Sequence, residues 1–332
     1  MFIALLCIAL REQSRNSIFI FLSNDNIHRH KFMMDIIVKL MCDLIRLFKL
    51  TLGVNIKSSQ KKYKEVFNTL KTYLKSKIIT FLDTLKISNK GRKRTIDWDK
   101  FFDCLFYITD NGLKMSYLKE KCGICKSTFY HYFSLISNSS FFEQIHAEIV
   151  HTYGKLEPDD YLITDTFTVK SMEGSEGVGR NPTDRGRNGI KVSIICDQNL
   201  ITHAVHLTSA NIHDSKILIP TTESSISDLH GKKCLADSGY AGHKYISKIK
   251  QITGISLISK PKRTNNLSIM SHQISEKDSI LLQRKRNYIE RLNGNIRKFR
   301  GLMIKYTKKM SSYRTYLFIA ILCITCYCLF VL

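Results

Sequence analysis

The sequence predicts an α/β protein in which a mixed β-sheet with flanking helices follows an all-helical N-terminal region. Up to about residue 150, apolar residues recur at helical spacing, and from Asp160 onward short runs rich in β-branched residues appear. With 332 residues the chain is long enough for two or three domains, and its 44% apolar content excludes a wholly disordered protein. Ten scattered cysteines indicate reduced intracellular thiols rather than a disulfide framework.

The helical part divides into two segments. Residues 1–60 include an amphipathic stretch at 34–50 and are predicted to form a helical extension, because their apolar start lacks the basic flank of a signal peptide. Residues 61–150 form a second helical segment, and the α/β part is predicted over 157–332.

A helix-turn-helix pattern lies within the second segment. A helix over 98–110 stops at an Asn-Gly pair, a short helix follows over 115–122, and a further helix begins at Lys126 after a turn at Gly123. In such a unit the second helix enters the DNA major groove with its first turn facing the bases. Residues 61–150 are therefore predicted to be a DNA-binding domain, and an ordinary three-helix packing domain is the alternative.

Two groups of side chains in this segment are candidates for DNA contact. The first turn of the second helix presents Lys126, Ser127, Thr128 and His131, with Phe129 and Phe133 turned to the core. A basic arm upstream is predicted to contact phosphate or a minor groove, and it consists of Arg92, Lys93 and Arg94.

Five strands are predicted in the α/β part, over 161–165, 191–197, 202–209, 232–237 and 254–260. A short connection joins the second strand to the third as a hairpin, whereas helix-length connections join the third to the fourth and the fourth to the fifth. Hairpins pair strands antiparallel and helical crossovers pair them parallel, so the sheet is predicted to be mixed.

The net charge of +23 is concentrated at two places in the chain. Residues 51–100 carry +9 and residues 251–332 carry +12, while the 150 residues between them are close to neutral. This distribution is expected if basic flanks hold a polyanion, above all a nucleic acid, over a centre that contains carboxylates. The alternative is an AT-rich genome, since Lys outnumbers Arg by 35 to 16.

Three carboxylates stand where a metal site needs them. Asp165 is expected at the end of the first strand and Asp237 at the end of the fourth. Glu290 lies on a patterned helix over 281–303, where Arg286, Glu290 and Arg297 fall within about 40° of one another. Oxygen ligands of this kind hold the hard cations that assist phosphoryl transfer. The arginines would keep Glu290 ionised and clamp a phosphate.

A Gly-rich loop before the second strand offers further cations. It is predicted either to contact phosphate beside the metals or to be a flexible surface loop, and its basic residues are Arg180, Arg185, Arg187 and Lys191. A later segment, Asn211, His213 and Asp214, is expected to line the site or to orient the first strand, with His213 as a structural hydrogen-bonder or a proton shuttle.

These motifs, in this order, resemble those of the insertion-sequence DDE transposases, in the superfamily of insertion sequences four and five. The similar segments are LITDTFTV, GRNPTDRGRNGIKVSIICD, LTSANIHDS, CLADSGYAG and RNYIERLNGNIRKFR. The resemblance implies a ribonuclease-H-like fold, a metal-binding triad of Asp165, Asp237 and Glu290, and Arg286 in the signature Arg position. Gln283 stands where the signature often has Tyr, and Arg297 stands where it has Lys.

The resemblance also implies a function. A DNA transposase of this kind binds the inverted repeats at the ends of its element, hydrolyses phosphodiester bonds there with Mg²⁺ (two ions, with Mn²⁺ as a substitute), and joins the freed 3′-hydroxyl to target DNA. It works as a homo-oligomer on double-stranded DNA. Its location would be cytoplasmic and nucleoid-associated in a bacterium, and nuclear if it comes from a eukaryote or a virus.

Other readings of the sequence are a catalytically decayed transposase that only binds DNA, a simple metal-dependent nuclease, and a tail-anchored membrane protein. The last rests on residues 315–332, which carry no charge and follow a basic flank. Because members of the resembled family commonly end in an apolar helix packed on the catalytic domain, a buried core helix is the prediction for this segment, and no membrane partner is expected.

Overall fold

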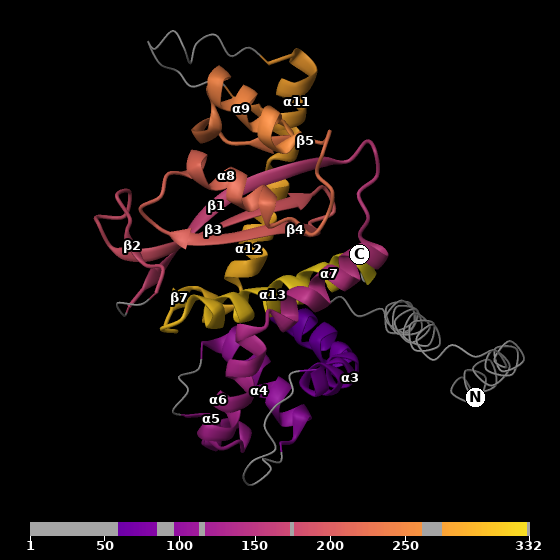
Figure 1. Cartoon of the computed structure of the whole chain (residues 1–332), viewed down its shortest axis with the longest axis vertical. Coiled ribbons are helices and arrows are strands. Elements are labelled where there is room, and N and C mark those ends of the chain that lie inside the picture. The colour runs from indigo at the N-terminus through magenta and orange to yellow at the C-terminus, as the bar shows by residue number, and fades with distance from the viewer. Residues whose placement is uncertain (1–58, 85–95, 113–116, 173–175, 261–273, 331–332) are drawn as a thin grey trace, which may run out of the picture. The chain divides into compact units, whose positions relative to one another are not determined.

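The helices and strands are described from a computed structural model over residues 59–84, 96–112, 117–172, 176–260 and 274–330 (Figure 1). The chain divides into two compact units, Met1–Gly53 and Val54–Leu332, and all described residues belong to the second. The predicted extension over 1–60 lies almost wholly outside the described residues, as does the basic arm of Arg92, Lys93 and Arg94.

The N-terminal part of this unit is helical, as predicted. The helices are α3 (Ser59–Thr84), α4 (Trp98–Asn111), α5 (Leu118–Cys122), α6 (Lys126–Asn138) and α7 (Phe141–Tyr153). The Asp97 side chain caps α4 by accepting from the backbone N–H groups of Asp99 and Lys100. Gly112 ends α4 at φ 72°, a left-handed conformation that favours glycine. The predicted stop of the first helix and the turn at Gly123 are both confirmed.

The sheet has the predicted mixed topology. Its strands are β1 (Tyr161–Ser171), β2 (Gly179–Arg180), β3 (Asn188–Asp197), β4 (Thr202–Ser209), β5 (Lys233–Ala236), β6 (Ser256–Ser259) and β7 (Ile304–Lys305). The five main strands lie in the order β4-β3-β1-β5-β6. The pairs β1–β3 and β3–β4 are antiparallel, and β1–β5 and β5–β6 are parallel. This is a ribonuclease-H-like sheet with flanking helices.

The strand β1 differs most from its predicted length, while β3 begins three residues earlier than predicted and β5 and β6 are shorter. β1 was expected to stop at Asp165 but continues to Ser171, so Asp165 lies in the middle of the strand. The extension forms because Phe167 and Val169 alternate with polar residues and because β3 pairs with this part of the strand as far as Gly189.

The remaining helices are α8 (Asp214–Glu223), α9 (His243–Thr253), α11 (Glu276–Lys285), α12 (Asn287–Arg297) and α13 (Met310–Phe330), with short 3₁₀ turns η2 (Ser238–Tyr240) and η3 (Arg300–Leu302). The helix predicted over 281–303 is thus divided. A turn at Arg286 separates α11 from α12, and α12 ends at Arg297. In Figure 1 the two run as one column from the α9 side of the sheet to α13.

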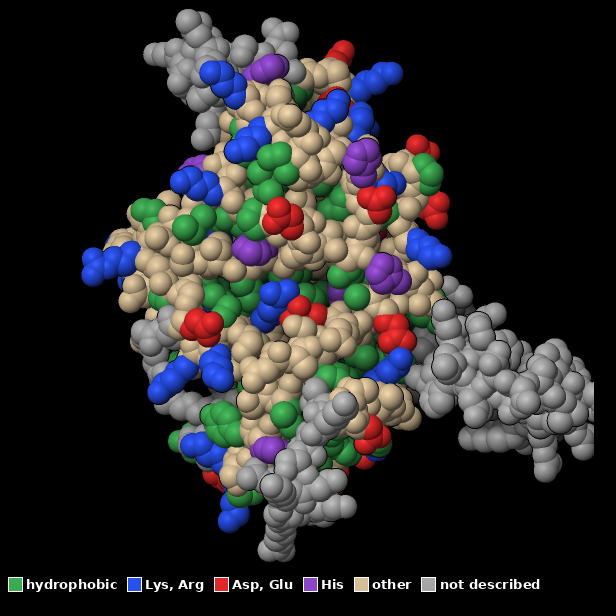
Figure 2. Space-filling model, viewed as in Figure 1, with side chains coloured by type: hydrophobic (Ala, Val, Ile, Leu, Met, Phe, Trp, Pro, Cys, Tyr) green, Lys and Arg blue, Asp and Glu red, His purple; other side chains and the backbone are tan. Residues whose placement is uncertain are grey.

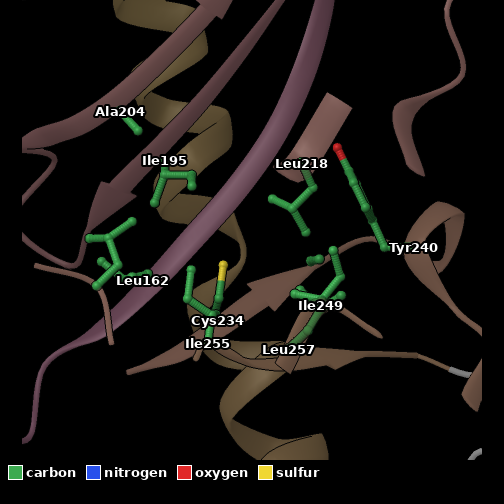
Figure 3. Packing of buried hydrophobic residues seen from close by; sticks show 11 residues of the cluster. Leu162, Ile195, Ala204, Leu218, Cys234, Tyr240, Ile249, Ile255 and Leu257 are labelled. Atoms are coloured by element: carbon green, nitrogen blue, oxygen red, sulfur yellow. The ribbon is translucent and has the colours of Figure 1, made fainter. Parts of the chain in front are cut away.

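The core of the α/β part lies between one face of the sheet and helices α8 and α9 (Figure 3). Leu162 of β1, Leu218 of α8 and Ile249 of α9 belong to one cluster of buried side chains, together with Cys234 of β5 and Leu257 of β6. Because side chains alternate along a strand, the residues of β1 next to Leu162 face the other side of the sheet, where α12 packs.

Helix α13 is a core helix, as predicted. It packs against α3, α4, α6 and α7 and also contacts β4 and α12. Residues from Thr315 to Cys326 are buried throughout. Within the described part of the chain, α13 is the one helix long and apolar enough to cross a membrane, and 72% of its most apolar window is buried inside the protein.

A buried histidine links α7 to α13 and makes folding stability dependent on pH. His146 is 1% exposed, and its Nε2 lies 3.2 Å from Thr325 Oγ1. Burial lowers the pKa of His146 to about 3, with a smaller contribution from His203. His146 therefore binds a proton near pH 6.5 in the unfolded chain, whereas in the folded chain it stays neutral down to about pH 3.

Above pH 6.5, His146 is neutral in the folded and the unfolded chain and does not lower the free energy of unfolding. As the pH drops from 6.5 toward 3, protonation of His146 in the unfolded chain should lower the free energy of unfolding. The loss from this group should be about 1.4 kcal/mol per pH unit within that window. In His146→Gln, which hydrogen-bonds but does not titrate, urea unfolding at pH 7.5 and pH 5 should show a smaller difference. Parallel pH dependence in the two proteins would contradict this role.

Candidate active site

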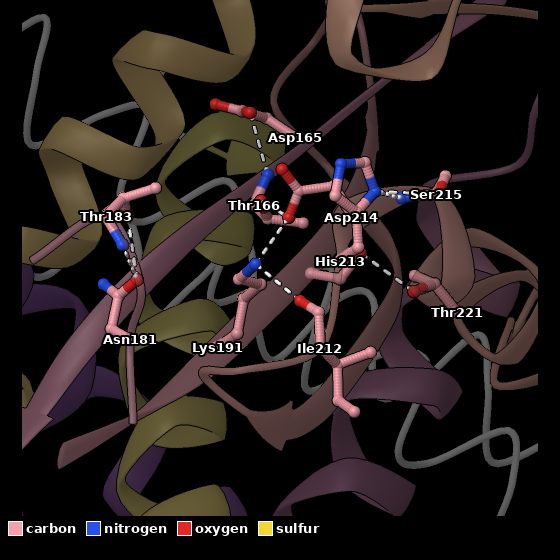
Figure 4. Close-up of polar contacts among 11 residues, drawn as sticks. Asp165, Thr166, Asn181, Thr183, Lys191, Ile212, His213, Asp214, Ser215 and Thr221 are labelled. Carbon is pink, nitrogen blue, oxygen red and sulfur yellow. Dashed lines mark hydrogen bonds and ion pairs between the residues drawn. The ribbon is translucent and has the colours of Figure 1, made fainter. Parts of the chain in front are cut away.

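The site begins at Asp165, which the alternation of β1 places on the α12 side of the sheet. Its Oδ2 accepts a hydrogen bond of 3.1 Å from Asn293 Nδ2 on α12, and its Oδ1 accepts one of 2.8 Å from the Thr166 N–H. Figure 4 shows the second of these contacts. One carboxylate oxygen is thus oriented by the strand and the other by the helix.

Asp237 follows β5, the parallel neighbour of β1. The ladder pairs Ile163 with Leu235 and ends there; continued by two residues, the same register would bring Asp165 level with Asp237, on neighbouring segments about 5 Å apart. Asp237 Oδ1 accepts a 2.6 Å hydrogen bond from the Ser238 N–H and forms a 3.1 Å ion pair with Arg286. The two aspartates and Arg286 are brought together by the fold.

The electrostatics of this pair favour a cation. Burial raises the pKa of Asp165, and the charges of Asp237 and Asp214 raise it further, while the Thr166 N–H and Arg286 oppose the shift. Two carboxylates held at adjacent strand positions repel each other, and the carboxylate oxygens are the donors that hard divalent cations prefer. The two aspartates therefore fit a divalent metal ion.

Glu290 is placed differently from the two aspartates. It lies in the first turn of α12, four residues after Arg286 and three before Asn293, so it shares the helix face that contacts both aspartates. Its side chain is exposed. Among the described residues no group of three or more His, Cys, Asp and Glu is placed to hold a metal ion, so the predicted triad is not gathered into one cluster.

Arg297 continues this face of α12 at the other end. Its guanidinium lies 5.6 Å from the centroid of the Phe167 ring on β1, and the side chain is exposed. The face that carries Arg286, Glu290, Asn293 and Arg297 therefore runs along β1 past the aspartates.

A second polar network ties β1 to α8 and β3. Asp214 Oδ1 accepts from Thr166 Oγ1 at 2.9 Å and from Lys191 Nζ at 2.8 Å, and Lys191 also donates to the Ile212 carbonyl at 2.7 Å (Figure 4). Of the two roles predicted for Asp214, the contact with Thr166 agrees with the one in which it orients the first strand. Lys191 has partners inside the protein, and its predicted phosphate contact stays a prediction.

His213 has a structural position. It caps α8, where its Nδ1 accepts a 3.2 Å hydrogen bond from the Ser215 N–H. Asn211, two residues earlier, is exposed and accepts a 2.6 Å hydrogen bond from Ser209 Oγ.

The Gly-rich loop forms a hairpin between β2 and β3. Arg180 pairs with Asn188, and Asn181 closes the tip by donating from its N–H to the Arg187 carbonyl at 2.9 Å. Arg185 adopts φ 52° at that tip. The three arginines are exposed, and Arg187 lies 3.8 Å from Asp184. The loop presents its cations from a turn with internal hydrogen bonds.

In the helix-turn-helix region the core prediction holds, since Phe129 and Phe133 of α6 are buried. Lys126 and Ser127 are exposed at the start of α6, and Thr128 and His131 are half-buried. Figure 2 shows Lys and Arg side chains spread over the viewed face, from the α/β part to the helical part.

Asn293 and Thr166 are the contacts to Asp165 that the sequence did not single out. The signal for Asn293 is its spacing of three residues after Glu290, which places it on the same helix face.

Substitution of Asn293 by Ala should weaken the binding of a divalent metal ion at the two aspartates by about 10–100-fold, the usual cost of losing a group that orients a metal ligand. Titration of the purified protein with Mg²⁺ or Mn²⁺ measures this change. Asn295→Ala, two residues further along α12 and about 200° round the helix from Asn293, is the matched control. Unchanged metal dependence in Asn293→Ala would contradict an orienting role.

The strand order, with Asp165 and Asp237 on neighbouring parallel segments, defines a ribonuclease-H-like fold with an acidic site. The family model for the transposase DDE domain matches residues 157–326, and the chain belongs to this family. Membership implies dependence on a divalent metal.

Two known proteins are similar to the chain. A putative transposase for insertion sequence element IS402 from Burkholderia cepacia is 27% identical over 169 residues, which cover 48% of this chain and 74% of that protein. The piggyBac transposase, in a cryo-EM structure of its synaptic complex with hairpin DNA, matches with a TM-score of 0.48 and 11% identity, covering 85% of this chain and 76% of that one.

Proposed function

We propose that the protein is a metal-dependent DNA transposase that cleaves DNA at the ends of its own element and joins the freed 3′-hydroxyl to target DNA. The main observation behind the proposal is that Asp165 and Asp237 lie on neighbouring parallel segments, with Arg286 paired to Asp237, in a chain of the transposase DDE family. The placement within the superfamily of insertion sequences four and five is part of the proposal.

In this proposal Asp165, Asp237 and Glu290 hold Mg²⁺, as two ions, with Mn²⁺ able to substitute. Bound there, the metal would neutralise the phosphate and favour deprotonation of the attacking oxygen. Glu290 is apart from the aspartates in this structure, and in the proposal its side chain turns toward them from the α12 face that already contacts both. Asn293 and the Thr166 N–H hold the Asp165 carboxylate in one orientation, which leaves less reorganisation for the reaction itself.

Arginines supply the phosphate contacts. Arg286 lies against Asp237, and Arg297 is exposed at the far end of the same helix face. Both are positioned to hold a DNA phosphate at the carboxylates by charge-assisted hydrogen bonds.

Duplex DNA is held by the helix-turn-helix and by the hairpin arginines. The proposed contacts are Lys126, Ser127, Thr128, His131, Arg180, Arg185 and Arg187, with Lys191 and the basic arm of Arg92, Lys93 and Arg94. Phosphate contacts of this kind make binding weaken steeply with salt. We propose that the active form is a homo-oligomer that pairs two inverted repeats, in the nucleoid of a bacterium or the nucleus of a eukaryotic or virus-infected cell.

The test is incubation of the purified protein with labelled DNA that carries the ends of its own genomic element, with Mg²⁺ or Mn²⁺. Cleavage followed by joining to a second DNA, absent in Glu290→Gln, is the expected result. Cleavage without joining would indicate a simple nuclease. Retention of activity in Glu290→Gln would remove Glu290 from the metal site.

A decayed transposase that only binds DNA is the second candidate. It is favoured by the separation of Glu290 from the aspartate pair and by the departures at Gln283 and Arg297. Specific DNA binding without cleavage by the wild type would select it, and Arg297→Lys and Gln283→Tyr would then be expected to restore activity.

A further inference from the structure

A cavity of about 590 Å³ lies in the helical part, away from the aspartate pair. Its wall is formed by α4, α6, the segment after β7 and the start of α13. Five aromatic rings line it: Tyr130, Phe133, Tyr306, Tyr313 and Tyr316. Of these, Tyr130 and Tyr306 are 40% and 49% exposed, so both rings are open to solvent.

The polar groups of the cavity suit an anionic ligand. Lys308 and Lys309 line it and are exposed, and none of the described lining residues is acidic. Among the described residues the hydroxyl of Tyr316, a buried wall residue, has no hydrogen-bond partner. Rings for stacking together with ammonium groups for a phosphate are the combination that proteins use for single-stranded nucleic acid.

The wall is held in place by the fold. Lys305, fully buried, donates from Nζ to the Thr307 carbonyl at 2.6 Å, and the Glu176 N–H donates to the Lys308 carbonyl at 3.1 Å. On the other side η3 packs directly on α4, since a Cβ on Gly301 would lie 2.2 Å from the Ile108 carbonyl oxygen. A pre-formed site of this size is typical for a small ligand or a single nucleotide.

The cavity borders the proposed recognition helix α6 and is connected through β7 to β1, the strand that carries Asp165. Tyr130 lies on α6, four residues after Lys126 at the start of the proposed recognition helix, and the Lys126 Nζ is 5.9 Å from the Tyr130 ring. Towards the sheet, Ile304 of β7 pairs with Lys170 of β1, which is five residues, or about 17 Å, along the strand from Asp165.

We propose that this cavity receives an unpaired nucleotide of the DNA, with its base against Tyr130 and Tyr306 and its phosphate at Lys308 and Lys309. The inference rests on the proposed function, because it assigns a place to a strand that has separated from its partner between the recognition helix and the acidic site. Opening of the duplex end would be stabilised by each base that stacks there.

The test is photo-cross-linking of the full chain to duplexes with a single-stranded overhang that carries 5-iodouracil at an unpaired position. Cross-links mapped by mass spectrometry to Tyr130 or Tyr306 are expected. They should fall at least tenfold when the same base is paired within the duplex. Tyr130→Ala should weaken binding of overhang DNA about tenfold and leave blunt duplex binding unchanged, while Tyr130→Phe should bind as the wild type does.

The matched control is Tyr107→Ala, since Tyr107 is 39% exposed on α4 and is not among the lining residues. Cross-links to other tyrosines, equal affinity for overhang and blunt DNA, or protection by free dAMP as effective as by overhang DNA would each overturn the proposal. If DNA is bound but Tyr130→Ala binds overhang DNA as tightly as the wild type does, only this inference fails. If no DNA of any form is bound, the proposed function fails with it.

Discussion

Replacing Asp165 with Asn should abolish DNA cleavage while leaving DNA binding intact. The variant side chain keeps its size, and its one oxygen can accept from Asn293 as before, which keeps the strand and α12 in contact; the hydrogen bond from the Thr166 N–H is given up. In the proposed mechanism, what is lost is the charge that would hold the metal beside Asp237, and loss of a metal ligand costs on the order of several kcal/mol of transition-state stabilisation. Cleavage should fall on the order of a thousandfold or more, measured on end-labelled DNA in Mg²⁺ or Mn²⁺.

Duplex binding by the same variant should be equal or slightly tighter in a gel-shift assay, since a negative charge has been removed near the phosphates. The free energy of unfolding should not decrease, because burial of the Asp165 carboxylate is itself unfavourable, as its raised pKa indicates. Asp159→Asn, an exposed aspartate in the turn before β1, is the matched control. Wild-type cleavage by Asp165→Asn would remove this residue from the site, and loss of folding would make it structural.

The fold was predictable because its local signals agree with its long-range pairing. The Asn-Gly pair after α4, the turn at Gly123 and the short link between β3 and β4 each define an element boundary in the sequence. The length of β1 was not predictable in the same way. Its second half alternates correctly, but whether Thr166 to Ser171 continue the strand depends on β3 as a partner, and a single segment does not specify its partner.

The site was predictable only in part, for a similar reason. The strand pattern placed Asp165 and Asp237 at strand ends, but it did not show that β1 and β5 are parallel neighbours, and Asp165 lies within β1. The contact from Asn293 to Asp165 joins positions 128 residues apart, and no local pattern encodes it. The aromatic cavity was missed because its rings come from α6, α13 and the segment after β7, and each of these presents only one or two of them.

Removing side-chain volume from the middle of α13 should destabilise the helical part as a whole. Leu322 is fully buried on a helix that packs against α3, α4, α6 and α7, so these helices share one core contributed by the end of the chain. Leu322→Ala should cost about 2–5 kcal/mol of the free energy of unfolding, through lost burial and the cavity left behind. Urea unfolding can be followed by the fluorescence of the single tryptophan, Trp98, on α4.

Leu329→Ala makes the same chemical change on the same helix, but Leu329 is only half-buried near the helix end, so its cost should be much smaller. A membrane-embedded α13 would make the two leucines equivalent and would leave unfolding around Trp98 unaffected by either change. A larger loss of the free energy of unfolding in Leu322→Ala than in Leu329→Ala would therefore indicate a core helix, and equal losses would indicate a helix in a membrane.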